Sequence, residues 1–344
     1  MSELAKNQLV NRRDFFRRTA GTAATASLGA ALVTRQSAFS AQTSTNPWAY
    51  DDSMFRRTDP NLIHYRETRR FPCLRPVPRC LALSKEDHLF IGAGKFVTKC
   101  TLEGAQLAEI KLTEEARCLA VAADGIVYVG LREQVEVYGA NGQLRSTWEK
   151  PPGQPYFTGL AVNSNELFVA DAGNRVVLRY DRAGKLKGRI GGKDKDKQIP
   201  GFIVPSPFFD VEIARDGLLR VTNPGRHRVE TYTPEGDLEA FWGQPGAAIE
   251  NFCGCCNPIN LATLADGRVV TLEKGIPRVK VYSAEGVFES VVAGAESFVE
   301  NAAVCGPKDC TVGGLDAVAD ARGGIYVLDL VAANVRVFEP NRNG

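Results

Sequence analysis

From about residue 60 onward, hydrophobic and polar positions alternate in short runs that are separated by glycine-containing turns. Each unit has an apolar run, an Asp-Gly or equivalent turn, a second apolar run, a polar loop, a third run ending in an aromatic residue, and a fourth run. Alternation with period two over about four to six residues is typical of half-buried β-strands. The pattern therefore predicts an all-β protein made of four-stranded units, and no alternation of strands with helices competes with it.

The unit is repeated six times along the chain. The copies begin at Cys80, Cys118, Gly159, Asp210, Asn260 and Asp316, and the first copy is degenerate. In four copies the aromatic residue is followed four positions later by a glycine, in the pairs Tyr138 and Gly142, Tyr180 and Gly184, Tyr232 and Gly236, and Tyr282 and Gly286. Repeats of about 40 to 55 residues with these turns are typical of propeller blades. The sequence thus predicts a six-bladed β-propeller.

The last blade needs a strand from elsewhere, because the sixth copy supplies only three strands. An open sheet edge invites aggregation, so the ring is expected to close. The segment Leu62 to Phe71 alternates in the same way and directly precedes the first copy. We therefore predict that this N-terminal strand completes the last blade and pairs with residues 334–339.

The first residues have the pattern of an export signal. The stretch "NRRDFFRR" is followed by an apolar run of small residues and then by "SAFSAQ". Arg12 and Arg13, with two phenylalanines behind them, resemble a twin-arginine signal. We expect a signal peptide over 1–41, a polar linker over 42–61 and the propeller over 62–340, in a periplasmic or otherwise exported protein. The apolar run is too short for a comfortable membrane span, so no transmembrane anchor is expected after signal cleavage.

Charge and composition narrow the possible functions. The chain of 344 residues has 42 basic and 40 acidic residues, a formal charge of +2, without strong segregation. A nucleic-acid-binding domain would show a basic patch or stripe, so a nucleic-acid partner is not expected.

The repeats resemble those of the NHL-repeat propellers over roughly residues 62–340. The best copy of the repeat is "LFVADAGNRVVLRYDRAGKL", which starts at Leu167. The resemblance implies an NHL-type propeller fold. It says little about activity, because propellers host many functions.

Most cysteines are expected on one face of the ring. Connections from an outer strand to the next inner strand all lie on the same face, and six of the nine cysteines fall in three such connections: Cys253, Cys255 and Cys256, Cys305 and Cys310, and Cys73. Structural disulfides, a zinc or iron-sulfur site, and a redox-active thiol pair all fit this cluster. We expect the 253–256 cysteines to approach Cys305 and Cys310, with Cys255 and Cys256 pointing to opposite sides of the chain. The other three, Cys80, Cys100 and Cys118, are expected to be buried thiols, with a disulfide between Cys80 and Cys118 as the alternative.

Two further features are expected on the cysteine-bearing face. Lys274 and Arg278 lie near the loop between the second and third strands of blade five, where a cation would lower a thiol pKa or bind an anionic partner; ordinary solvated loop charges are the alternative. The insertion Gly191 to Phe209 should wall the site, with Phe202, Ile203, Phe208 and Phe209 folded back on the ring.

These features favour an exported NHL-type propeller that acts as a binding or scaffolding module, with a cysteine-rich face in a redox, metal or iron-sulfur role. Its expected partner is another exported or membrane-bound protein, for example in a redox complex. The alternative is a propeller enzyme of lactonase or lyase type with a divalent metal at the central channel, where Asp210, Asn260 and Asp316 share one inner-strand position. Simple polar lining of a water-filled channel is the more ordinary interpretation of these three residues. The lyase resemblance implies histidine-bound zinc, but the three histidines, His64, His88 and His227, lie in different repeat contexts.

Overall fold

The computed structural model describes residues 53–196, 199–298 and 314–341. Arg12, Arg13 and the expected signal peptide lie outside the described residues, as do Cys305 and Cys310. No helix in the described ranges is long and apolar enough to cross a membrane.

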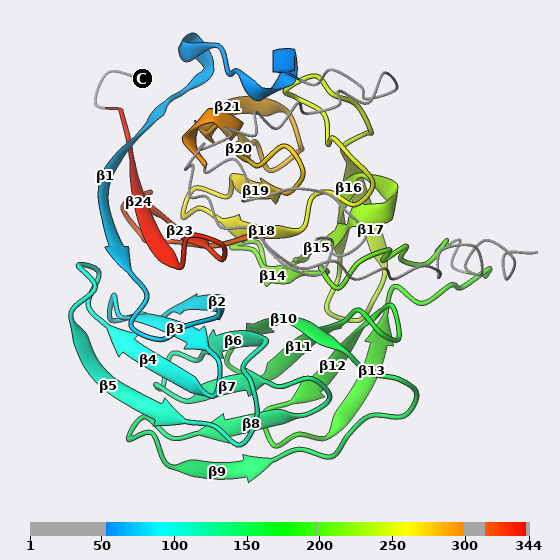
Figure 1. Ribbon diagram of the computed structural model, residues 1–344. Coiled ribbons are helices and arrows are strands. Elements are labelled where there is room, and N and C mark those ends of the chain that lie inside the picture. The colour runs from blue at the N-terminus through cyan, green and yellow to red at the C-terminus, as the bar shows by residue number, and fades with distance from the viewer. Residues whose placement is uncertain (1–52, 197–198, 299–313, 342–344) are drawn as a thin grey trace, which may run out of the picture. The chain divides into compact units, whose positions relative to one another are not determined.

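The structure is a ring of six sheets, each with four antiparallel strands (Figure 1). This confirms the six-bladed all-β propeller. Blade one consists of β2 (Pro78–Leu83), β3 (Leu89–Ala93), β4 (Phe96–Cys100) and β5 (Gln106–Lys111), and blade two of β6 (Cys118–Val121), β7 (Val127–Gly130), β8 (Val135–Tyr138) and β9 (Leu144–Thr147). Blade three consists of β10 (Phe157–Val162), β11 (Glu166–Asp171), β12 (Val176–Asp181) and β13 (Leu186–Ile190), and blade four of β14 (Val211–Ile213), β15 (Leu219–Asn223), β16 (Arg228–Tyr232) and β17 (Leu238–Trp242). Blade five consists of β18 (Asn260–Thr263), β19 (Val269–Glu273), β20 (Arg278–Tyr282) and β21 (Phe288–Ala293).

Blade six is completed by a strand from the other end of the chain, as expected. Its order is β22 (Leu315–Ala319), β23 (Ile325–Asp329), β24 (Asn334–Pro340) and β1 (Tyr65–Pro72). β1 pairs antiparallel with β24, from Tyr65 opposite Pro340 to Pro72 opposite Asn334. Behind this pairing the buried Arg336 binds the Glu67 carboxylate at 2.6 Å. The closing strand therefore starts three residues later than Leu62, which belongs to a short 3-10 helix instead.

The segment before β1 contacts blade five. The sequence predicts only a polar linker over 42–61, but the structure has two 3-10 helices here, η1 (Ser53–Arg56) and η2 (Pro60–Leu62). The carbonyl of Phe55 accepts a hydrogen bond from Arg278, and Thr58 donates one to Glu296 beside η4 (Ala295–Ser297). The His64 amide bonds the Val291 carbonyl at 3.2 Å. This part of the expected linker therefore lies against the outer side of blade five.

The spacing of tyrosine and glycine in the repeats has a packing cause. In blades three and five the tyrosine near the end of the third strand packs on a tryptophan at the end of the preceding blade's outer strand, with ring centroids 5.1 Å apart for Tyr180 and Trp148. Gly184 lies in the following turn with φ +92°, and a Cβ there would come within 2.5 Å of the Trp148 ring. Only glycine meets both requirements at low cost. Tyr282, Trp242 and Gly286 repeat the arrangement between blades four and five.

The Glu67 to Arg336 pair is expected to stabilise the closure of the ring. Burial raises the pKa of Glu67, but hydrogen bonds from Arg70 and Arg336 outweigh it and lower that pKa from 4.5 to about 2. Because the folded-state pKa is depressed, this stabilisation is complete above about pH 4.5 and is lost as the pH falls toward 2. Urea unfolding should show Glu67→Gln to be less stable by about 2 kcal/mol at pH 7, with a shallower loss in acid.

Glu339→Gln is the matched control for this prediction. It removes the exposed cross-strand pair between Glu339 and Arg66, which are 3.8 Å apart, and should cost less than about 0.5 kcal/mol. Equal losses of unfolding free energy in the two variants would show that the buried pair stabilises the protein no more than the exposed pair does.

Candidate functional site

The cysteine loop, residues 243–259, connects β17 to β18 on the face that carries the outer-to-inner connections. Cys255 is exposed, Cys253 is half-buried and Cys256 is buried. The Sγ atoms of Cys255 and Cys256 are 3.3 Å apart. The expectation that these neighbours point to opposite sides of an extended chain is therefore wrong, because the loop turns at this point and brings the two sulfurs together.

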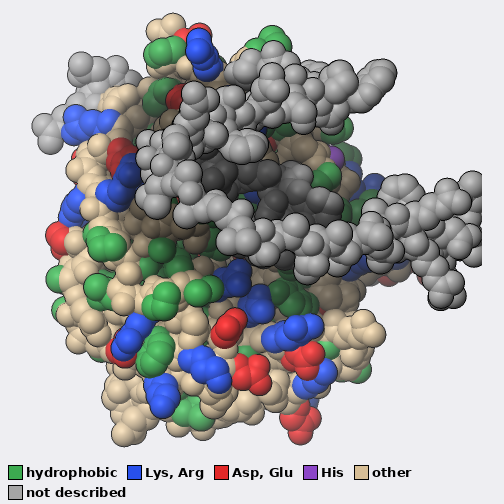
Figure 2. All heavy atoms as spheres, in the orientation of Figure 1, with side chains coloured by type: hydrophobic (Ala, Val, Ile, Leu, Met, Phe, Trp, Pro, Cys, Tyr) green, Lys and Arg blue, Asp and Glu red, His purple; other side chains and the backbone are tan. Residues whose placement is uncertain are grey.

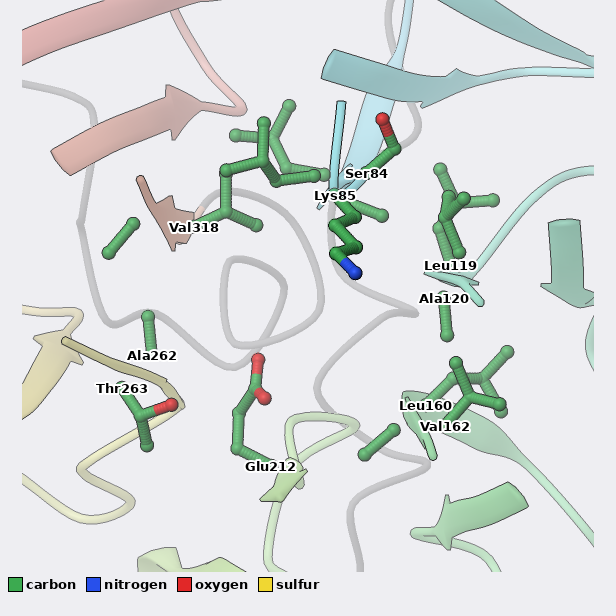
Figure 3. A pocket seen from close by; sticks show the side chains of 16 residues that line it. Ser84, Lys85, Leu119, Ala120, Leu160, Val162, Glu212, Ala262, Thr263 and Val318 are labelled. Carbon is green, nitrogen blue, oxygen red and sulfur yellow. The ribbon is translucent and has the colours of Figure 1, made fainter. Parts of the chain in front are cut away.

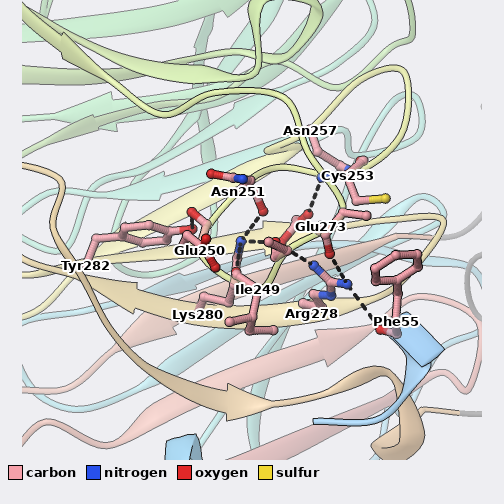
Figure 4. Close-up of polar contacts among 12 residues, drawn as sticks. Phe55, Ile249, Glu250, Asn251, Cys253, Asn257, Glu273, Arg278, Lys280 and Tyr282 are labelled. Atoms are coloured by element: carbon pink, nitrogen blue, oxygen red, sulfur yellow. Dashed lines mark hydrogen bonds and ion pairs between the residues drawn. The ribbon is translucent and has the colours of Figure 1, made fainter. Parts of the chain in front are cut away.

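A buried ion pair in blade five holds this loop through hydrogen bonds to its backbone. Lys280 in β20 and Glu273 in β19 have fully buried side chains, and their charged atoms are 2.7 Å apart. Lys280 Nζ also donates to the carbonyls of Ile249 and Asn251 at 3.0 and 2.8 Å (Figure 4). Burial lowers the pKa of Lys280, while the Glu273 charge opposes that shift. The ammonium thus stabilises carbonyls that would otherwise be buried without donors.

Lys274 and Arg278 are near the cysteine loop, as expected, but they are not solvent-facing cations. Arg278 is 2% exposed and Lys274 is 4% exposed. The Arg278 guanidinium donates to the carbonyls of Ala247 and Ala248. The Lys274 ammonium contacts Ser206 Oγ at 3.1 Å and lies 4.4 Å from the centre of the Phe208 ring. Both cations are therefore used to hold neighbouring loops in place.

The two ends of the Cys-Gly-Cys-Cys segment are also fixed by hydrogen bonds. The Cys253 amide donates to Glu273 Oε2 at 3.0 Å. Asn257 is buried, and its amide group donates to the Cys253 and Lys274 carbonyls while it accepts from the Lys274 amide. His227, from the neighbouring blade, contacts the Gly254 carbonyl through Nε2 at 2.6 Å. The segment that carries the thiol pair is thus held at Cys253, Gly254 and Asn257.

The other described cysteines lie in the blades or beside them: Cys80, Cys100 and Cys118 are buried and Cys73 is half-buried. Cys80 and Cys118 are buried thiols, and each sulfur fills the space beside a glycine of the next strand, Gly92 and Gly130 respectively. Burial and the nearby Cys100 and Asp329 raise the pKa of Cys73 to about 12, so its thiol is unreactive at neutral pH. The expected approach to Cys305 and Cys310 lies outside the described residues. Within the described ranges no group of three or more His, Cys, Asp or Glu side chains is placed to hold a metal ion.

The insertion before blade four walls the cysteine-bearing face as expected, apart from one residue. Phe202, Phe208 and Phe209 are buried, but Ile203 is 44% exposed. The Ile203 backbone bonds Asn223 Oδ1 and the Gly225 amide, and its side chain lies beside Gly225, where it remains partly exposed. Phe208 contacts Lys274, so the insertion reaches the loops of blade five.

The three polar inner-strand residues join neighbouring blades at the central channel. Asp210 accepts from the Leu261 amide, Asn260 donates to the Leu315 carbonyl, and Asp316 accepts from the Leu81 amide, at 3.0, 2.7 and 2.7 Å. Burial raises the pKa of Asp316 to about 7, against the effect of its backbone hydrogen bonds. Their oxygens are therefore committed in part to blade-to-blade contacts.

Below these residues the channel opens into a cavity of about 310 Å³ that all six inner strands line. Lys85 and Glu212 extend toward the middle of this cavity (Figure 3). Burial, reinforced by the nearby Asp316 charge, raises the pKa of Glu212 to about 8. The channel thus holds several carboxyl groups that keep protons near neutral pH.

Comparisons with known proteins show the fold alone. No family model and no curated protein sequence matches the chain. Among solved structures, a streptogramin B lyase is 12% identical with a TM-score of 0.55, over 80% of this chain and 98% of that one. A catalytically inactive virginiamycin B lyase from Staphylococcus aureus with quinupristin is 13% identical with a TM-score of 0.53, over 79% and 83%. The WD40 propeller domain of Doa1 is 15% identical with a TM-score of 0.51, over 77% and 79%. The chain is therefore similar in fold to propellers that range from a lyase to a WD40 domain.

Glu273 is expected to control the order of the cysteine loop. Glu273→Gln leaves the buried Lys280 without its counter-charge and should lower stability by about 3 kcal/mol. Hydrogen exchange followed by mass spectrometry should show the amides of residues 244–257 exchanging about tenfold faster than in the wild type.

Glu230→Gln provides the control for local opening. Glu230 is buried in blade four and pairs with Arg228 at 2.5 Å. Its loss should reduce global stability similarly but leave the relative protection of residues 244–257 unchanged. If both variants open the cysteine loop alike, the loop has no dedicated support in blade five.

Proposed function

We propose that the protein is an exported NHL-type propeller that binds another exported or membrane-bound protein through the cysteine loop, and that the thiols of this loop exchange disulfides with that partner. The observation that carries the proposal is the 3.3 Å separation of the Cys255 and Cys256 sulfurs. Cys255 is exposed and able to meet a partner, whereas Cys256 is buried directly beside it. This is the arrangement of an attacking and a resolving thiol.

The exchange balances without a cofactor. The Cys255 thiolate attacks a disulfide of the partner and expels one partner thiolate. The Cys256 thiolate then attacks the Cys255 sulfur of the mixed disulfide and expels the second. The loop loses two electrons and two protons as its thiols become a disulfide, and the partner's disulfide gains them. The immobilised loop favours this intramolecular step because the second thiol is already in place.

A zinc ion or an iron-sulfur cluster on this face is the competing role for the same cysteines. The described residues supply two adjacent sulfurs, and a site with four thiolates would need ligands beyond them, for which Cys305 and Cys310 are the candidates. The lyase and lactonase alternative receives no comparable support, because the oxygens of Asp210 and Asp316 bond neighbouring blades.

The exchange is tested with dithiobis(nitrobenzoate) on the reduced full chain. In the wild type, we expect thionitrobenzoate to be released twice and the loop peptide to carry a Cys255 to Cys256 disulfide by mass spectrometry. Cys256→Ser should keep one thionitrobenzoate on Cys255, and Cys255→Ser should react slowly. Cys73→Ser is the control and should behave as the wild type, because the raised pKa of Cys73 keeps its thiol protonated.

Metal analysis of protein purified without oxygen distinguishes thiol exchange from metal binding by the same cysteines. Less than stoichiometric zinc or iron, together with the double release, supports thiol exchange. Stoichiometric metal that is lost in both Cys255→Ser and Cys256→Ser, but kept in Cys73→Ser, would replace it with a metal-binding role.

Export is tested through the arginine pair. Replacing Arg12 and Arg13 together with lysine should keep the protein in the cytoplasm, because the twin-arginine translocon reads guanidinium groups at these positions. Fractionation followed by immunoblotting measures the result, with Arg17→Lys and Arg18→Lys as the matched control. Unimpaired export of the first variant would count against this signal.

A further inference from the structure

Two arginines lie at the mouth of the central channel without a carboxylate partner. Arg79 is the second residue of β2 and Arg117 directly precedes β6, so they occupy equivalent positions in blades one and two. No ion pair to either guanidinium is present in the described part of the chain, and Arg79 Nε is buried without any hydrogen-bond partner there. A buried N–H group without an acceptor is unfavourable, which indicates that an acceptor is supplied from outside.

The backbone directs these side chains into the mouth. The pairing of β2 with β3 shifts register between Pro78 and Cys80, so Arg79 is the extra residue of a β-bulge. Bulges redirect the side chain that they contain. Arg79 and Arg117 line a small cavity of about 50 Å³ together with Tyr156, Thr158 and Asn260.

The acidic residues nearest to the mouth do not neutralise the arginines. Asp210 and Asp316 turn toward the amides of Leu261 and Leu81. The pKa of Asp316 is raised to about 7 by burial, and only backbone hydrogen bonds oppose that shift, without a contribution from either arginine. Arg79 and Arg117 line one cavity of about 40 Å³ with Asp210 and Asp316, but among the described residues no ion pair joins these carboxyls to either guanidinium.

A wider groove continues outward from the mouth. Tyr156 and Pro207 line both the small cavity and a second cavity of about 460 Å³, which is bordered by Gly153, Gly173, Pro205 and Arg132. The Tyr156 ring lies between two guanidiniums, 4.9 Å from that of Arg117 and 5.3 Å from that of Arg132. The Tyr156 hydroxyl also accepts a hydrogen bond from Arg117. On the face seen in Figure 2, Lys and Arg side chains, interspersed with a few Asp and Glu, lie over blades one to three.

We infer that the channel mouth binds the carboxylate of a small organic acid between Arg79 and Arg117, and that the apolar body of the acid lies in the groove beside Tyr156. A guanidinium donates two parallel hydrogen bonds to a carboxylate, and one of these would give the buried Nε–H of Arg79 the acceptor that it lacks. Tyr156, Val204 and the prolines of the groove provide apolar contact area for the rest of the ligand, beside the polar side chains of Arg132, Glu133 and Lys150. This site is separate from the cysteine loop and does not depend on the role proposed for it.

Isothermal titration calorimetry of the full chain with N-acetylphenylalanine tests the inference. We expect the acid to bind and its neutral analogue, N-acetylphenylalaninamide, to bind at least tenfold more weakly. Arg79→Gln and Arg117→Gln should each weaken binding of the acid at least tenfold. Arg145→Gln is the control, because it removes the same charge from an exposed position on β9 and should leave binding unchanged.

Several outcomes would overturn the inference. One is equal binding of the acid and the amide, a comparison that needs only the wild type and holds even if an arginine variant fails to fold. Others are unchanged affinity in both mouth variants, or no binding of the acid at about 10 mM. Inorganic phosphate binding as tightly as the acid would overturn the carboxylate assignment in favour of a phosphate ligand.

Discussion

Closure of the ring by β1 is the constraint on which the rest of the structure depends. A propeller blade buries its two faces only against its neighbours, so a missing outer strand in blade six would expose an edge and weaken contacts around the whole ring. β1 and β24 come from opposite ends of the described chain, and Arg336 is buried behind them with Glu67 as its counter-ion. The pairing thus joins the two ends of the described chain in one sheet.

The same need for contact between blades explains the chemistry of the central channel. Six inner strands converge there without pairing with one another, and in three of the six blades a polar side chain at an equivalent position bonds the next blade. In blades one and two the position holds a cysteine that fills space beside a glycine, whereas in blades four, five and six it holds Asp210, Asn260 and Asp316, which bond the next blade. The acidic residues of the channel are therefore explained in large part by contacts between blades. Arg79 and Arg117 at the channel mouth make no such contact with a carboxylate in the described residues.

The repeats made the fold predictable, because the same packing problem is solved in each blade with similar residues. The spacing of Tyr180 and Gly184 reflects the packing of the tyrosine ring on Trp148 and the positive φ of the glycine. The repeated spacing of these two residues can be recognised in the sequence. The site was predictable only in its location. Placing the sulfurs of Cys255 and Cys256 requires the path of a loop, and that path is set by Glu273 and Lys280, which come later in the chain. Their visible signal was the presence of charged residues in two mainly apolar strands, Glu273 in "VVTLE" and Arg278 and Lys280 in "RVKVY".

Burying a lysine, an arginine and a glutamate in one blade is a poor way to gain stability, since desolvation offsets much of the attraction between buried charges. Apolar side chains of similar size would serve a blade at least as well, as Leu178 does at the position in blade three that Lys280 occupies in blade five. What apolar side chains cannot do is bind the carbonyls of Ala247, Ile249 and Asn251. Buried charges also occupy this third-strand position in blades two, four and six, as Glu136, Glu230 and Arg336. Blade five differs in what its buried cations bind, because Lys280 and Arg278 donate to backbone carbonyls of the loop that carries Cys255 and Cys256. The desolvation cost in this blade is therefore offset by a fixed conformation of that loop.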